Sequence, residues 1–111
     1  MAKKSGNTAI AELCLRRAGG GLRDAPKAYR VCEYVCFWAL ATRMLGHDPN
    51  QFEFARWWAQ GFGGSVATAY RRKDEFRELF PEDKTPARLV GLMVKEEGEP
   101  GPFTELVGVA V

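Results

Sequence analysis

Between Pro26 and Leu45 the sequence is apolar on nearly every side of a helical wheel. Pro26 suits the first turn of a helix, and Gly46 suits the position just after its end. The longest unbroken apolar run in this segment, residues 34–41, has eight residues, whereas a membrane span needs about 20. A helix of this kind is buried at the centre of a small domain or in an oligomer interface. The rest of the chain must therefore supply its cover.

The remaining sequence predicts shorter helices around this central one. Polar capping residues and apolar positions at helical spacing mark their starts, and glycine or proline marks their ends. With the central helix at about 26–45, the other expected ranges are about 9–17, 51–60, 65–80 and 86–95. Since 111 residues are one domain's worth of chain, we expect a single all-α domain of about five helices.

Two local features leave alternatives open. The helix at 51–60 is capped by Asp48 or by Asn50, because either side chain can accept a hydrogen bond from an N-terminal backbone N–H. We expect residues 103–111 to form a strand or an extended docking arm, and a hairpin with residues 89–94 is the alternative arrangement. In this division the tri-helical unit spans about 26–80, and a C-terminal helix and arm span about 85–111.

Charge is distributed unevenly along the chain. Residues 1–47 carry eight Lys and Arg against three Asp and Glu, residues 48–80 carry five of each, and residues 81–111 carry three against six. The net charge is only +2. This polarity suits a protein with one basic face, a feature of proteins that bind polyanions and also of many solvated surfaces.

Residues 54–72 indicate a helix, a glycine turn and a second helix that begins Ser65-x-x-Thr68-Ala69-x-Arg71. This pattern resembles helix-turn-helix DNA-binding domains, especially those of phage-borne and transposon-type regulators. The resemblance implies that Ser65 caps the second helix and that small Ala69 lets the two helices approach closely. It also implies that Thr68, Arg71 and Arg72 point outward to base edges in the major groove.

The turn is longer than is usual for that family. Nine residues separate Ala55, the small residue of the first helix, from Ser65. Either the turn is extended, or Ala59 takes the place of Ala55; Phe62 would fill the hydrophobic position of the turn. Lys73 falls on the apolar side of the wheel, so we expect it to snorkel or to reach a phosphate. The predicted DNA-contact residues are Arg56, Ser65, Thr68, Arg71, Arg72 and Lys73.

The cysteines and the single histidine indicate neither a metal site nor catalysis. Cys14, Cys32 and Cys36 are an odd number of thiols, and their spacing with His47 matches no zinc-binding pattern. We expect reduced cysteines that pack as small hydrophobes. A general base needs a nucleophile and an orienting group, and no pattern around His47 supplies them. We therefore expect no cofactor, no metal and no enzymatic activity.

The sequence thus favours a cytoplasmic protein that binds double-stranded DNA sequence-specifically, as a transcriptional regulator or as a recombination accessory factor of a phage or mobile element. No secretory signal and no membrane partner are expected. A palindromic DNA site would call for a homodimer, with the apolar central helix or the C-terminal arm as the interface. The alternative is a small helical module that binds a host or partner protein through its aromatic helices.

Overall fold

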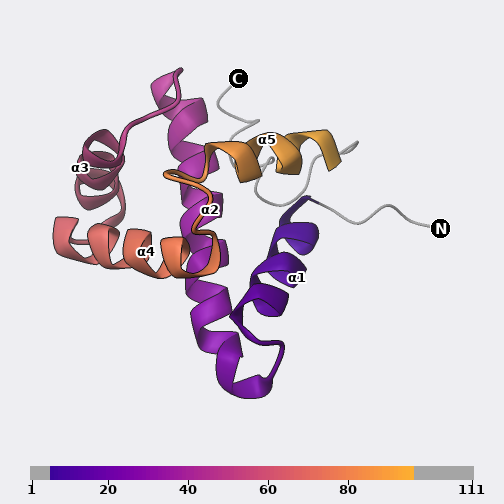
Figure 1. The fold of residues 1–111 in the computed structure, drawn as a ribbon. Coiled ribbons are helices and arrows are strands. Elements are labelled where there is room, and N and C mark those ends of the chain that lie inside the picture. The colour runs from indigo at the N-terminus through magenta and orange to yellow at the C-terminus, as the bar shows by residue number, and fades with distance from the viewer. Residues whose placement is uncertain (1–5, 97–111) are drawn as a thin grey trace.

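The computed structural model describes residues 6–96 of the chain (Figure 1). They form five α-helices and one short 3-10 helix, and no strand occurs among them. The all-α prediction is therefore confirmed. The helices are α1 (Gly6–Ala18), α2 (Ala25–Leu45), α3 (Gln51–Phe62), α4 (Val66–Leu79) and α5 (Ala87–Glu96), and the 3-10 helix η1 (Leu22–Asp24) precedes α2.

Helix α2 is the centre of the fold, as its apolar sequence predicts. Helices α1 and α5 pack on one side of it and α3 and α4 on the other (Figure 1). Helix α1 also contacts α5, and α3 contacts α4. None of the helices within residues 6–96 combines the length and the hydropathy needed to cross a bilayer. The buried residues of α2 are Ala28, Val31, Tyr34, Val35, Trp38, Ala39, Leu40 and Ala41.

Aromatic side chains join α2 to α3 and α4. Trp38 stacks on Phe54 with ring centroids 4.9 Å apart, and both side chains are almost completely buried. Tyr34 lies edge-on to Phe54 at 5.3 Å and 5.7 Å from Phe76. Its hydroxyl donates a 2.6 Å hydrogen bond to the Oε1 of Gln51, so this buried polar group is satisfied. Tyr34 therefore connects all three helices of the central unit.

The loop between α2 and α3 settles which residue caps α3. The side chain of Asn50 accepts a 2.8 Å hydrogen bond from the backbone N–H of Glu53, and the Glu53 carboxylate accepts one from the backbone N–H of Asn50 at 3.1 Å. This reciprocal pair is a capping box. Asp48 accepts instead from the indole N–H of Trp38 at 3.1 Å, which holds the loop against the core.

The C-terminal region differs from one of the expected alternatives. Residues 87–96 are helical, so the proposed hairpin between 89–94 and 106–111 is wrong. Leu89 and Met93 are buried in the core, and their spacing of four residues is the spacing of one helix face. The prediction for residues 103–111 falls outside the described part of the chain.

The three cysteines lie where α1 meets α2, and all are free thiols. Burial raises the pKa of Cys14 to about 12. Cys32 and Cys36 are half-buried and hydrogen-bond to each other, which lowers the pKa of the Cys32 thiol. No group of three or more Cys, His, Asp or Glu side chains in the described region is arranged to hold a metal ion.

Candidate nucleic-acid interface

The turn between α3 and α4 sets the start of the candidate reading helix. Helix α3 continues through Gly61 and Phe62, past its predicted end, and stops at Gly63. Gly63 has φ +70°, a conformation that costs a residue with a side chain about 1–2 kcal/mol. A Cβ on Gly64 would lie 2.9 Å from the ring of Trp58. The turn thus needs glycine at both positions, once for conformation and once for space.

Ser65 caps α4 as predicted, and its hydroxyl begins a chain of hydrogen bonds. The Ser65 Oγ accepts from the backbone N–H of Thr68 at 3.0 Å and lies 2.8 Å from the Thr68 Oγ1. The Arg71 Nη2 in turn donates to the Thr68 Oγ1 at 3.1 Å. Arg71 is exposed, and it forms no salt bridge with any described residue. The Ser65–Thr68–Arg71 chain therefore presents one oriented, uncompensated guanidinium at the first turns of α4.

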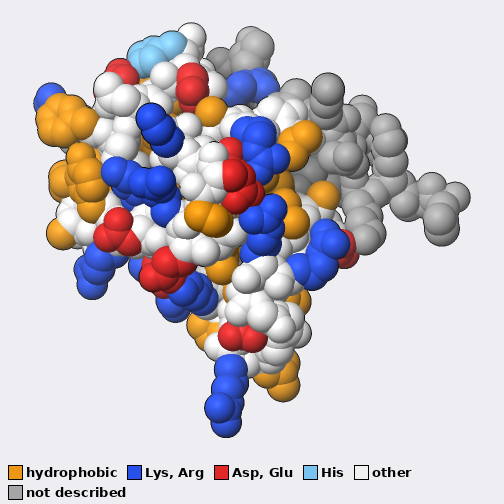
Figure 2. All heavy atoms as spheres, viewed as in Figure 1, with side chains coloured by type: hydrophobic (Ala, Val, Ile, Leu, Met, Phe, Trp, Pro, Cys, Tyr) orange, Lys and Arg blue, Asp and Glu red, His pale blue; other side chains and the backbone are white. Residues whose placement is uncertain are grey.

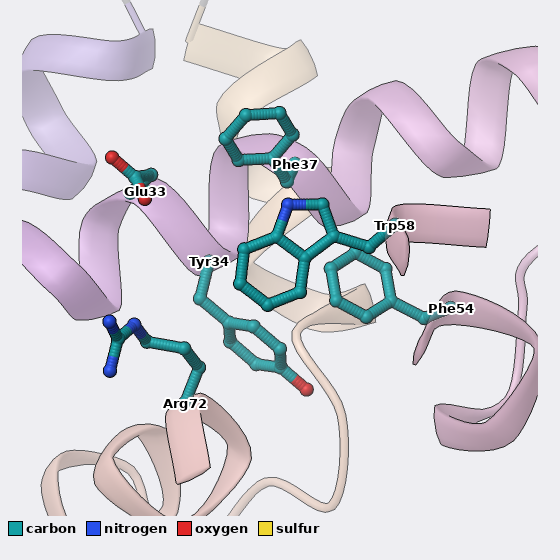
Figure 3. Close-up of a pocket in the computed structure, with 6 residues that line it drawn as sticks. All are labelled: Glu33, Tyr34, Phe37, Phe54, Trp58 and Arg72. Carbon is teal, nitrogen blue, oxygen red and sulfur yellow. The ribbon is translucent and has the colours of Figure 1, made fainter. Parts of the chain in front are cut away.

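The side chain of Arg72 does not point fully outward, contrary to the prediction. The Arg72 side chain is only 25% exposed, and its Nη1 is 3.1 Å from the Oε1 of Glu75. Figure 3 shows Arg72 extending from α4 toward α2, beside the ring of Tyr34. A helical wheel places positions 71 and 72 about 100° apart, and here α2 lies against the second of them. The same wheel cannot show where a neighbouring helix packs.

Glu75 connects α4 to α2 through Arg30. The Arg30 Nε lies 3.1 Å from both carboxylate oxygens, and its Nη2 lies 2.6 Å from Oε2. The pKa of Glu75 is lowered mainly by the hydrogen bonds that Arg30 donates to it. Glu75 therefore neutralises much of the charge that Arg30 and Arg72 would otherwise offer to a partner.

Two further residues predicted to contact DNA, Arg56 and Lys73, form no hydrogen bond with the Ser65–Thr68–Arg71 chain. Arg56 is an exposed residue of α3, and its guanidinium is 5.7 Å from the ring centroid of Phe52. Lys73 is half-buried, and its ammonium lies 5.8 Å from the ring centroid of Tyr70. This position agrees with the snorkelling expected for Lys73.

Helices α3 and α4 contact each other, and each carries one buried alanine. Ala55 and Ala69 are both fully buried, whereas Ala59 is only half-buried. Ala55 is thus the fully buried alanine of the two, and nine residues separate it from Ser65. Phe62 contacts Trp57 and Phe37 at 4.7 Å and 5.3 Å between ring centroids, yet it remains 44% exposed. Phe62 therefore fills the turn position only in part.

Two residues near this face were not singled out as contacts from the sequence. Arg30 and Asp74 line an open hollow of about 400 Å³ together with Arg71, Arg72 and Glu75. No sequence signal marks Arg30, because its partner Glu75 lies 45 residues away. In Figure 2, Lys and Arg side chains alternate with Asp and Glu over the face that carries α4.

His47 has a local role in the α2–α3 loop. Its Nε2 lies 2.8 Å from the Oε2 of Glu53, and its Nδ1 lies 3.2 Å from the carbonyl oxygen of Leu45. The interaction with Glu53 raises the pKa of His47. These contacts tie the end of α2 to the first turn of α3.

No protein-family model, curated protein or solved structure matches the chain. The function must therefore be inferred from the arrangement of its own residues.

Proposed function

We propose that this protein binds double-stranded DNA sequence-specifically through the N-terminal half of α4. Its role would be that of a cytoplasmic transcriptional regulator or recombination accessory factor, with the α3–turn–α4 unit used as a helix-turn-helix. The observation that carries the proposal is the Ser65–Thr68–Arg71 chain. It holds an exposed arginine, free of carboxylate partners in the described region, on a capped helix that follows a constrained glycine turn.

The chemistry of these side chains suits a major groove. A guanidinium can donate two hydrogen bonds to the O6 and N7 of guanine, and a threonine can contact a thymine methyl group or a phosphate. The N-terminus of α4 also carries the positive end of the helix dipole, which favours a nearby phosphate. Because Thr68 already holds the Nη2 of Arg71, less side-chain freedom is lost on binding.

The test is a random-oligonucleotide selection followed by a salt titration of affinity for the selected duplex. Affinity should fall steeply with salt, because each phosphate contact releases counterions. Arg71→Ala should then weaken binding to the selected site by about 1–3 kcal/mol while the melting temperature stays unchanged. Arg77→Ala is the matched control, since Arg77 is an exposed arginine of the same helix.

Failure would take one of two forms. A selection that enriches no sequence, with no salt-dependent binding to any duplex, contradicts DNA binding altogether. Equal losses for Arg71→Ala and Arg77→Ala would instead mean that α4 acts only through its charge. A palindromic selected site would further call for a homodimer, which sedimentation of the protein with and without DNA would detect.

A specific observation favours protein binding as the second candidate function. Helix α3 exposes Phe52 by 57% and Phe62 by 44%, and exposed aromatic side chains are enriched in protein interfaces. If a partner protein binds there, Phe52→Ser should abolish its binding and leave DNA affinity intact. Arg71→Ala should have the opposite effect, so the pair of variants separates the two functions.

A further inference from the structure

The open hollow between α2 and α4 has the composition of an anion site. Arg30 lines it from α2, and Arg71 and Arg72 line it from α4 together with Asp74 and Glu75. Three guanidinium groups face two carboxylates, which leaves one positive charge in excess. The volume is about 400 Å³, so side chains of these two helices leave the space open to an incoming group.

Each of the three guanidinium groups keeps hydrogen-bond donors that no described residue uses. Glu75 takes the Nε and Nη2 of Arg30 and the Nη1 of Arg72. Thr68 takes the Nη2 of Arg71. Since a guanidinium has five N–H donors, an amino group remains on each arginine. The unused amino group of Arg30 can therefore donate to an anion in the hollow.

The guanidinium groups are also held in place before any ligand arrives. Glu75 binds Arg30 through both carboxylate oxygens and Arg72 through one. The Arg72 Nε is buried without a hydrogen-bond partner, which is an unfavourable state for a donor. Behind Arg72, the pocket drawn in Figure 3 has no room for a water molecule. A ligand therefore approaches Arg72 from the open hollow and not from the core.

We propose that this hollow binds one phosphate of the DNA backbone, with Arg30 donating to it through the amino group that Glu75 leaves unused and with Glu75 as a positioning residue. The inference rests on the proposed function. Arg71 belongs both to the hollow and to the Ser65–Thr68–Arg71 chain, so a duplex that meets the chain brings its backbone to the hollow. A single excess positive charge suits a phosphodiester, which carries one negative charge, better than a free phosphate dianion.

The test compares Arg30→Gln with Arg16→Gln in salt titrations on a selected and on an unrelated duplex. Arg16 is an exposed residue of α1, on the other side of α2 (Figure 1), and its replacement changes the net charge equally. Loss of one phosphate contact should make the slope of log affinity against log salt shallower by about 0.9. Arg30→Gln should show this change by the same factor on both duplexes, and Arg16→Gln should not.

A measurement on the unaltered protein keeps the test independent of folding. The Nε–H resonance of Arg30, followed by NMR with ¹⁵N-arginine, should shift when the unrelated duplex is added. Inorganic phosphate should shift it only at far higher concentration; equal potency of the two would identify a free-anion site and overturn the proposal. An Arg30 resonance that DNA leaves unchanged would overturn it as well.

The two proposals fail in distinguishable ways. If the wild-type protein binds no duplex at any salt concentration, the proposed function is wrong and this inference falls with it. If the wild-type protein binds DNA but the slopes of Arg30→Gln and Arg16→Gln are equal, only the phosphate site is overturned.

Discussion

The two halves of α4 differ in what their charged side chains contact. In the N-terminal half, Ser65, Thr68 and Arg71 contact one another, and Arg71 forms no ion pair within the described residues. In the C-terminal half, Glu75 binds Arg30 of α2, and Glu78 pairs with Lys27 of the same helix. The C-terminal half of α4 is thus fastened to α2 by ion pairs, whereas Arg71 in the N-terminal half pairs with no carboxylate of the described residues.

The difference shows that adjacent, chemically identical residues can have separate roles. Arg71 and Arg72 differ by one position, yet only Arg72 lies against α2 and shares Glu75 with Arg30. Arg72 is held by the ion pair that also joins α4 to α2, whereas Arg71 has no ion pair among the described residues. A reading helix needs both, because base contacts require a side chain that is free and a backbone that does not move.

The largest expected effect on stability comes from removing a buried side chain in the C-terminal half of α4. Phe76 is completely buried and stacks on Phe80 at 5.2 Å between ring centroids. Phe76→Ala should therefore lower the free energy of unfolding by about 3–5 kcal/mol. Val66 lies in the N-terminal half of α4 and is 42% exposed. Val66→Ala should therefore change the free energy of unfolding by less than about 0.5 kcal/mol. Urea denaturation measures both; similar losses would contradict the division of α4 into two halves.

Smaller effects on stability, of opposite sign at two glycines, test the turn between α3 and α4. Gly63→Ala should destabilise the protein by about 1–2 kcal/mol, because Gly63 has a left-handed backbone. Gly61→Ala should stabilise it by about 0.5–1 kcal/mol, since Gly61 is helical and a Cβ there meets nothing within 4 Å. Thermal melting checks the signs.

DNA binding by the same two glycine variants would sharpen the comparison. Gly63→Ala should lower affinity even where the protein remains folded, whereas Gly61→Ala should not. If Gly63→Ala melts and binds DNA as the wild type does, the turn does not hold α4 as a reading helix.

The smallest expected effect is the pH dependence of the stability that Glu75 contributes in the C-terminal half of α4. The pKa of Glu75 is lowered in the folded protein, mainly by hydrogen bonds from Arg30. Its contribution to stability is therefore fully present above the ordinary carboxyl pKa of about 4.3. That contribution is lost as pH falls through the folded pKa. The free energy of unfolding of Glu75→Gln should differ from that of the wild type at pH 6 and converge toward it in acid; a constant difference would contradict this role.

Much of the fold could be predicted because its signals are local. The cap at Ser65, the glycine turn after α3 and the burial of α2 depend on residues close together in sequence, and the structure confirms each. The 3-10 helix η1 was not predicted, because three residues offer too short a pattern. The extension of α3 through Gly61 and Phe62 was missed for a different reason: glycine in a helix is tolerated when packing nearby supports the helix.

The candidate site depends both on the local sequence of α4 and on the tertiary packing of α4 against α2. The sequence by itself determined that Ser65, Thr68 and Arg71 lie within the first turns of one helix, since their spacing follows from the helical repeat. Only the tertiary structure decided that Arg72 pairs with Glu75 and that Arg30 lies beside them. The reason is physical: the bond between Arg30 and Glu75 spans 45 residues, and it exists only because packing around Tyr34 brings α2 and α4 together.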